Sequence, residues 1–350
     1  MMKIVSANDP STWQTYLDLL DVGRKDPHYL SQYLKLLADL PDGPSKTYFG
    51  GEAFLCVYSL KDNFVLYPFF KRPQRLVEPG SNESVKIFDI VSPYGYGGPL
   101  VVTENDASQE LLESFFQEFH RYCQEQNVVS EFCRLHPLFQ NHLLINQACS
   151  AEIRDLGKVV YVDLNQTDER ILQDMHPSRK RNARRAIARN CTYQFGNIDD
   201  RIKDFYDIYV ATMQRRGAQD RYYFPLTFFE MADQYLGEHL HFAYVENKGK
   251  MIAGCLMLIY GEVAYYWLGG SNAEYLAMNP NDLLFVRAIL DIKKTGAKYL
   301  VLGGGVGVSE DTLFVYKTRF SSLTRDFYVY SKVHLGKQYK MLTANNHHTE

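Results

Sequence analysis

The sequence predicts an α/β protein of two related domains, each with a mixed, mostly antiparallel sheet flanked by helices. Its 350 residues, 46% of them hydrophobic and 23% charged, are enough for two domains that each bury a core. Both halves repeat one order of elements: a hairpin, a strand end rich in glycine, a helix and a further strand. We therefore place one domain at 1–155 and a second at 156–340, followed by a polar tail at 341–350, and expect a cleft between or across the domains.

The first half begins with helical periodicity over 11–40, which ends at the Pro- and Gly-containing segment 41–44. Apolar strands at 53–58 and 64–70, joined by a polar turn, then predict a hairpin. The glycine-rich stretch 92–99 follows. A helix over 107–125 and a strand over 128–135 complete this half.

The second half opens with a strand at 158–164 and repeats the order of the first. Helical spacing over 199–216 ends at Gly217, and glycine is typical just beyond a helix. Three strands and a helix come next, and a short strand returns to the sheet. We assign these elements to 240–245, 251–260, 262–271, 282–295 and 299–302.

The most informative stretch is 298–320, where a short apolar strand runs into Gly303, Gly304 and a third glycine. Glycine backbone lets a ligand approach closely. Asp311 or Ser309 can cap the helix that follows, which carries Lys317. This arrangement suits an anionic ligand or a polarised carbonyl group, although a plain strand-to-helix connection with a surface lysine has the same pattern. The spacing fits neither a P-loop nor a dinucleotide fingerprint, so we expect no ordinary ATP or NAD site.

A second informative stretch, 176–190, is strongly basic and contains no acidic residue. It predicts a helix, capped by Ser178, on which Arg181, Arg184 and Arg185 lie close together. Such a face either contacts phosphate groups or is simply solvated. Arg215 and Arg221 border the polar loop after the next helix, and loops of this kind bind ligands or serve only as connections.

Several classes of protein are excluded. The net charge of −3 argues against a general nucleic-acid-coating surface, and we expect no DNA partner. The six cysteines and ten histidines show no metal-ligand spacing, so we expect no metal and predict buried free thiols. No signal peptide or membrane-spanning run is present, which indicates a cytoplasmic protein. Nucleophile-elbow and zinc-protease motifs are missing as well, which favours a transferase that works by positioning and electrostatics.

The chain resembles the Fem family of peptidoglycan interpeptide-bridge aminoacyl transferases and the related GNAT-type acyltransferases. The resemblance extends over about 50–330 and is carried by Pro93-Tyr-Gly-Tyr-Gly-Gly-Pro99, the basic helix, Tyr265-Tyr-Trp-Leu-Gly-Gly270, Asn279-Pro-Asn-Asp-Leu-Leu284, Leu302-Gly-Gly304, and Asp311 with Tyr316-Lys317. It implies tandem GNAT-like domains. It also implies transfer of an aminoacyl group from charged tRNA, or of an acyl group from CoA, to an amine of a cell-envelope precursor, with no tightly bound cofactor.

Two departures from the family concern the donor. The long helical-hairpin arm of some Fem members has no counterpart here. The usual GNAT pyrophosphate loop, Arg/Gln-x-x-Gly-x-Gly/Ala, is also not evident.

Lys317 aligns with the lysine of the family's Phe-Lys pair, with Tyr316 in place of phenylalanine. By this resemblance Lys317, with Asp311, forms the catalytic pair, and Lys317 stabilises the oxyanion of the reacting carbonyl. The predicted binding residues are Tyr94, Tyr96, Tyr265 and Tyr266 along the cleft, Arg181, Arg184 and Arg185 at phosphate, and Arg215, Arg221, Gly303 and Gly304.

Two alternatives stay open at the level of sequence. The first is an acyl-CoA-dependent N-acyltransferase that acts on an amino sugar in surface-polysaccharide assembly. The second is a non-catalytic protein that binds an anionic polymer through the basic helix.

Overall fold

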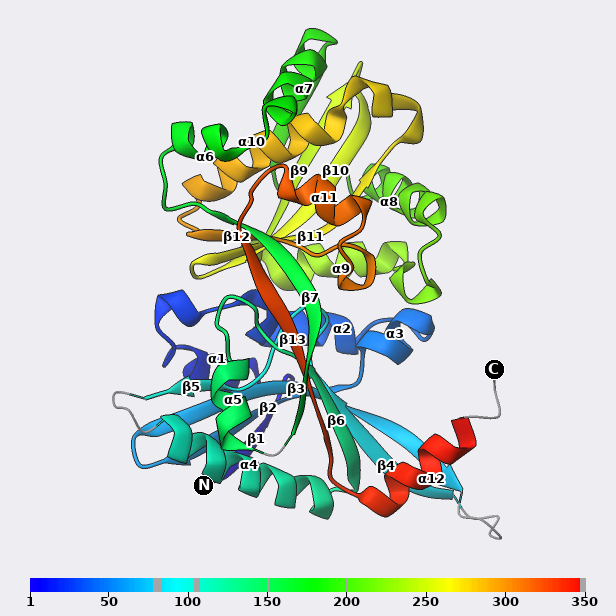
Figure 1. Ribbon diagram of the computed structural model, residues 1–350. Coiled ribbons are helices and arrows are strands. Elements are labelled where there is room, and N and C mark those ends of the chain that lie inside the picture. Colours follow the sequence, from blue (N-terminus) through cyan, green and yellow to red (C-terminus); the bar gives the residue numbers. More distant parts are fainter. Residues whose placement is uncertain (78–83, 104–107, 150, 199–200, 347–350) are drawn as a thin grey trace.

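The computed structural model describes the chain except for residues 78–83, 104–107, 150, 199–200 and 347–350. In this part of the chain the strands form one continuous sheet of 13 strands, with helices packed on both of its faces (Figure 1). The strand order is β1-β2-β3-β4-β6-β13-β7-β12-β11-β10-β9-β8, and β5 pairs with β3. The predicted fold class is confirmed.

The first half contains the hairpin, the helix and the closing strand that the sequence predicts. Its elements are β1 (Met2–Ser6), α1 (Pro10–Leu17), η1 (Val22–Arg24), η2 (Pro27–Tyr29), α2 (Ser31–Ala38), α3 (Pro44–Phe49), β2 (Glu52–Leu60), β3 (Asn63–Val77), β4 (Ser84–Val91), β5 (Leu100–Val102), α4 (Ser108–Glu125), β6 (Val128–Arg134) and α5 (His142–Ala148).

The second half repeats the order. Its elements are β7 (Glu152–Asp163), α6 (Asp168–Asp174), α7 (Pro177–Ala188), β8 (Cys191–Gly196), α8 (Ile202–Arg216), η4 (Asp220–Tyr222), α9 (Leu226–Leu236), η5 (Gly237–His239), β9 (Leu240–Asn247), β10 (Lys250–Tyr260), β11 (Val263–Ser271), η6 (Ala273–Met278), α10 (Pro280–Lys294), β12 (Tyr299–Gly303), η7 (Val306–Val308), α11 (Thr312–Thr318), β13 (Thr324–Val333) and α12 (Gly336–Asn346). Helix α8 ends, as predicted, at a left-handed Gly217.

Each half contains a parallel strand pair within an otherwise antiparallel sheet. In the first half the pair is β4 with β6, and in the second it is β11 with β12. The β11–β12 pairing covers only Val263–Tyr265 opposite Tyr299–Val301. Beyond this point the two strands no longer pair, which leaves the end of β11 free to line a cavity.

Strand β13 returns the chain from the second half to the first. It pairs with β7 along one edge and with β6 along the other, and α12 then packs near β6 and β3. The predicted domain limit at 155 falls inside β7. The two halves therefore share one sheet, in which β13 lies between β6 of the first half and β7 of the second.

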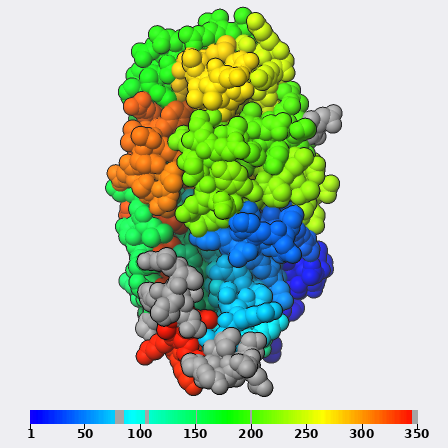
Figure 2. Space-filling model, turned by 90° about the vertical axis from the view of Figure 1, so that its right-hand side faces the viewer, coloured from blue at the N-terminus to red at the C-terminus, as the bar shows by residue number. Residues whose placement is uncertain are grey.

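The halves also share a hydrophobic core. One buried cluster combines residues of α1 and α2 with residues of α9 and β11, among them Trp13, Leu34, Phe228 and Leu268. Helix α9 packs on α2 and η4 packs on α3, where the second half adjoins the N-terminal segment (Figure 2). Within the described residues no helix combines the length and hydropathy needed to cross a bilayer. The six cysteines are free thiols, five buried and one partly buried.

Candidate active site

Lys317 lies in the last turn of α11, and its side chain points inward. Only 6% of its surface is exposed. Its Nζ donates a hydrogen bond to the carbonyl oxygen of Gly304 over 2.6 Å. Burial lowers the pKa of this ammonium group to about 8; Asp311 opposes the shift and Arg216 adds to it. The lysine is thus a buried cation near its titration point, not a surface residue.

The glycines before α11 make room for this ammonium group. Gly303 has φ +81°, and a Cβ at this position would lie 3.3 Å from Lys317 Nζ. The carbonyl group of Gly304 is the hydrogen-bond acceptor of Lys317. The two glycines that the sequence singled out are therefore both beside the lysine.

A cavity of about 130 Å³ lies between β11, α8, α10 and α11, with Lys317 in its wall. Its lining residues are Thr212, Arg215, Arg216, Gly254, Tyr266, Gly269, Gly270, Ser271, Asn281, Leu284, Phe285, Leu313, Tyr316 and Lys317. Three of them are cations and none is a carboxylate. The cavity is consequently electropositive and suited to a polarised or negatively charged group.

The two arginines of the cavity come from the end of α8. Arg215 donates to the carbonyl oxygen of Ser271 over 3.0 Å and to its Oγ over 3.3 Å. Burial lowers the pKa of Arg215, and the neighbouring Arg216 lowers it further. No described residue accepts a hydrogen bond from the Arg216 side chain or forms an ion pair with it. Arg216, which the sequence did not single out, can therefore bind an incoming group.

The four tyrosines predicted to line one cleft are divided between two places. Adjacent side chains of a strand point to opposite faces of the sheet. Tyr266 consequently lines the Lys317 cavity, with Lys317 Nζ 5.8 Å from its ring centroid, while Tyr265 points toward the first half. Tyr94 and Tyr96 lie on the Tyr265 side. Among the tyrosines predicted for the cleft, only Tyr266 is at the cavity.

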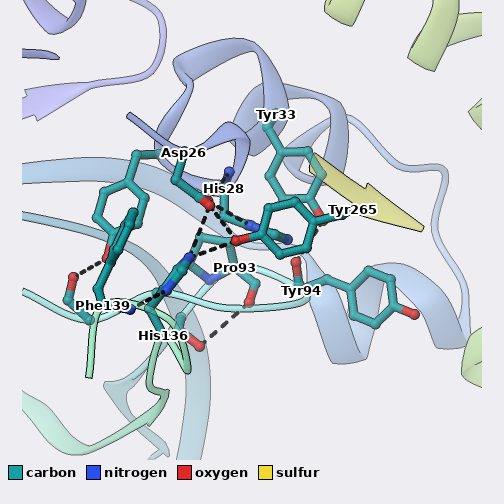
Figure 3. A network of polar contacts seen from close by, with 12 residues as sticks. Asp26, His28, Tyr33, Pro93, Tyr94, His136, Phe139 and Tyr265 are labelled. Carbon is teal, nitrogen blue, oxygen red and sulfur yellow. Dashed lines mark hydrogen bonds and ion pairs between the residues drawn. The ribbon is translucent and has the colours of Figure 1, made fainter. Parts of the chain in front are cut away.

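Tyr265 takes part in a buried polar network that joins the two halves (Figure 3). Its hydroxyl group donates to Oδ2 of Asp26, which also lies 3.0 Å from His136 Nε2. Oδ1 of Asp26 accepts from the backbone N–H of His28 over 2.9 Å and lies 2.7 Å from His28 Nδ1. All four side chains are at most 3% exposed, so Asp26 is buried but fully hydrogen-bonded.

The hydrogen bonds of His136 define its tautomer. Its Nδ1 accepts from the backbone N–H of Phe139 over 3.0 Å, so the proton of the neutral ring is on Nε2, facing Asp26 and Tyr265. Burial lowers the pKa of His136. Burial alone would raise the pKa of Asp26, but the two histidines outweigh it and lower that pKa, so the carboxylate stays ionised.

The remaining two tyrosines pack around this junction. The Tyr94 ring lies among Phe49, Tyr222 and Phe224, and its carbonyl oxygen accepts from Tyr33 Oη over 2.6 Å. The Tyr96 ring is 5.6 Å from that of Tyr265. The network itself was missed, because His136 and Tyr265 are far from the local Asp26–His28 contact in the sequence and reach it only through the fold.

The basic helix α7 divides into a buried and an exposed part. Arg181, Arg184 and Arg185 are exposed, as expected for a binding or solvated face. Arg179 instead is buried and forms an ion pair with Asp282 over 2.5 Å. The helix is capped by His176, which accepts from the N–H of Ser178, so the predicted Ser178 cap is wrong. Arg184 and its neighbours therefore contact neither the cavity nor Lys317.

Two further predicted site residues, Arg221 and Asp311, contact other parts of the protein and lie outside the Lys317 cavity. The guanidinium of Arg221 stacks 4.0 Å above the Tyr48 ring and is not part of the Lys317 cavity. The Asp311 carboxylate caps α11 by accepting from the N–H groups of Leu313 and Phe314, each over 2.9 Å. It does not line the cavity. Its predicted catalytic role stays a prediction, and its capping role is confirmed.

The comparisons with known proteins agree with this site. Residues 177–317, from the start of α7 to Lys317, match the family model of the GNAT acetyltransferase domain. The strand divergence, the cavity and the lysine all lie within this segment. The protein is therefore an acyltransferase with a GNAT domain in its second half.

Solved structures extend the likeness to nearly the whole chain. FemX has a TM-score of 0.62 at 12% identity, over 89% of this chain and 97% of FemX. The C-terminal domain of a putative lysylphosphatidylglycerol synthetase from Agrobacterium fabrum has a TM-score of 0.56 at 13% identity, over 97% of both chains. L-PGS from Bacillus licheniformis has a TM-score of 0.50 at 13% identity, over 92% of this chain and 96% of that one. A search of curated protein sequences found no match. The chain thus has a Fem-like tandem GNAT fold.

Proposed function

We propose that this protein transfers an aminoacyl or acyl group from an activated donor to an amine of a cell-envelope precursor. The main support is the buried Lys317, whose ammonium group binds a carbonyl oxygen, that of Gly304, at the edge of an electropositive cavity. A donor carbonyl can take the place of Gly304. The amine nitrogen attacks the carbonyl carbon, Lys317 stabilises the oxyanion, and the bond to the carrier oxygen or sulfur then breaks as the amine loses a proton.

The donor we favour is charged tRNA. In GNAT proteins the resemblance places the pyrophosphate of CoA at a loop before a helix, which corresponds here to the start of α10. That turn contains the buried Asp282, which accepts from Arg179 over 2.5 Å, from Asn182 over 2.7 Å and from Tyr316 Oη over 3.1 Å. Because Asp282 is paired with Arg179, the first turn of α10 offers no unpaired cation of its own to a phosphate group.

The exposed arginines of α7 support the same choice. The N-terminal turn of α7 is joined to α10 through Arg179 and Asp282, and Tyr316, another partner of Asp282, lines the Lys317 cavity. Farther along α7, Arg181, Arg184 and Arg185 form no ion pair with any described residue. Such a row of free guanidinium groups matches the phosphates of a nucleic-acid backbone. The fold shared with FemX and with lysylphosphatidylglycerol synthetase supports aminoacyl transfer and an acceptor from the cell envelope.

One observation favours the second candidate, an acyl-CoA-dependent N-acyltransferase acting on an amino sugar. The cavity has three cations and no carboxylate, and this repels the α-ammonium group of an aminoacyl donor. An uncharged acyl group avoids this repulsion. Matched donors separate the candidates, since glycyl-tRNA and acetyl-CoA differ in both carrier and charge, whereas butyryl-CoA and β-alanyl-CoA have the same number of heavy atoms in the acyl group and differ in its charge.

The proposal is tested by incubating the purified protein with charged tRNA or acyl-CoA and candidate amines. We expect Lys317→Met to lower turnover by roughly a hundredfold or more, because it removes the oxyanion partner. Lys203→Met, at an exposed lysine of α8, serves as the matched control and should leave turnover unchanged. Since the protonated form acts, the wild-type rate should fall as pH rises through about 8. A rate that rises there indicates instead that Lys317 is a general base.

A further inference from the structure

The triple-glycine turn, Gly303 to Gly305, contacts two charged groups. Gly303 leaves space for the ammonium group of Lys317, and the carbonyl oxygen of Gly304 accepts its hydrogen bond. A Cβ at Gly305 would lie 2.2 Å from Asp311 Oδ1 and 2.2 Å from the carbonyl oxygen of Ser309. Only glycine permits the carboxylate to sit there. The same three residues therefore seat both the lysine and the aspartate.

The Asp311 carboxylate closes this turn from the other side. Its Oδ2 accepts from the backbone N–H of Val306 over 3.1 Å, while its Oδ1 caps the first turn of α11. One side chain thus ties the start of the loop to the start of the helix. Lys317 follows in the last turn of that helix, so the position of its Nζ relative to Gly304 depends on this tie.

The charges around Lys317 make Asp311 important beyond its hydrogen bonds. Arg215 and Arg216 face the lysine from α8, Tyr266 faces it from β11, and Tyr316 adjoins it on α11. The positive charge of Arg216 lowers the pKa of Lys317 and so disfavours its ammonium form. The negative charge of Asp311 raises that pKa and so favours the ammonium form.

We propose that Asp311 is a positioning residue that holds the triple-glycine turn against Lys317 and places a negative charge on the other side of that turn. The proposal rests on the proposed function only in giving Lys317 a role in catalysis. The geometry and the charge state of the lysine exist without any substrate. They are therefore measurable independently of turnover.

The test is a pH titration of Lys317 by NMR in protein labelled with [13Cε]lysine, with the signal assigned by its loss in Lys317→Met. We expect a midpoint near 8 in the wild type. Asp311→Asn keeps an oxygen that can cap α11 but removes the charge, so it should move the midpoint to lower pH. Arg216→Gln should move it to higher pH. Where donors are turned over, the falling limb of the pH–rate profile should shift in the same directions.

Glu310→Gln is the matched control, since Glu310 is a neighbouring exposed carboxylate 3.8 Å from Lys158. It should leave the midpoint unchanged. An unchanged midpoint in Asp311→Asn, or an equal shift in Glu310→Gln, would overturn the proposal. Titration as expected without turnover on any donor would refute the proposed function alone, whereas turnover with an unshifted midpoint would refute only the role of Asp311.

Discussion

At the scale of single residues, the burial of the Lys317 ammonium group lowers the free energy of unfolding. Its pKa falls from 10.5 to about 8, so folding must bury a charge at neutral pH. The linkage amounts to about 3 kcal/mol below pH 8. We expect Lys317→Met, which keeps the length of the side chain and removes the charge, to raise the free energy of unfolding by up to this amount at pH 7. Urea unfolding of both proteins measures the difference.

The sign of the pH dependence identifies the cause of this gain. The wild type recovers its stability as pH rises from about 8 toward 10.5, where the unfolded lysine also loses its proton. The advantage of Lys317→Met should therefore shrink over this range. Lys203→Met is again the control, and a gain of equal size there, or one independent of pH, would show that the charge of Lys317 is not responsible.

His136 provides a second residue-scale prediction, in the acid range. Its pKa is lowered in the folded state from 6.5, so below pH 6.5 the unfolded chain binds a proton that the folded chain does not. Folded-state stability is thus complete above pH 6.5 and declines as pH falls, by up to about 1.4 kcal/mol per pH unit. In His136→Gln the decline between pH 6.5 and 5 should be less steep. Equal slopes in the two proteins would mean that protonation of His136 does not cause this loss of stability.

At the scale of elements, the connection from β12 to α11 depends on Gly303. Alanine there would have to adopt φ +81°, which costs about 1–2 kcal/mol, and its Cβ would press on Lys317 Nζ at 3.3 Å. We expect Gly303→Ala to be less stable than the wild type by this amount, and to turn over donors more slowly because the ammonium group of Lys317 is displaced. Gly196→Ala, at the end of β8 with open space around it, is the control and should change neither. Similar losses in both would contradict the argument.

Much of the connection from β12 to α11 could be predicted from the sequence, because it depends on residues that are close together in the chain. The glycine run, the cap at Asp311 and the helical spacing to Lys317 all lie within twenty residues, so hydrogen-bonding and conformational preferences along the chain are enough to predict them. The strand Val263–Ser271 was harder. Its two tyrosines were predicted to line one cleft, although the alternation of a strand sends Tyr265 and Tyr266 to opposite faces.

Residues that function through distant partners were not predictable. Arg179 differs from Arg181 in the sequence only by position, and its burial depends on Asp282, about a hundred residues later in the chain. Tyr265 likewise meets Asp26 only when the two halves pack. A single sequence contains no local signal for such pairs, because their burial is decided by the whole fold.

At the scale of the whole molecule, the repeat predicted two domains, whereas the return of β13 makes the halves interdependent. Strand β13 pairs with β6 of the first half and β7 of the second, so neither half completes its sheet alone. Helices α2 and α9 also bury a common core. A repeat of elements indicates related halves, but it cannot show that one strand is shared between them.

This interdependence predicts that the two halves unfold together. The chain contains one tryptophan in each half, Trp13 in α1 and Trp267 in β11. Trp13→Phe and Trp267→Phe each leave a single fluorescent reporter for one half. Because strand pairing and core are shared, the two urea transitions should coincide with each other and with the loss of circular dichroism.

The decisive comparison disturbs the shared strand at a point where it pairs with both halves. Val329 is a buried residue of β13 that lies opposite Arg134 of β6 and Arg154 of β7, so Val329→Pro removes one backbone donor there and distorts the strand between the two ladders. If β13 couples the halves, this variant should separate or broaden the two tryptophan transitions, whereas Val333→Pro, at the exposed end of the strand, should leave them closer to coincidence. Separate transitions already in the parent proteins would mean that the halves fold as independent domains and that the shared strand adds no cooperativity between them.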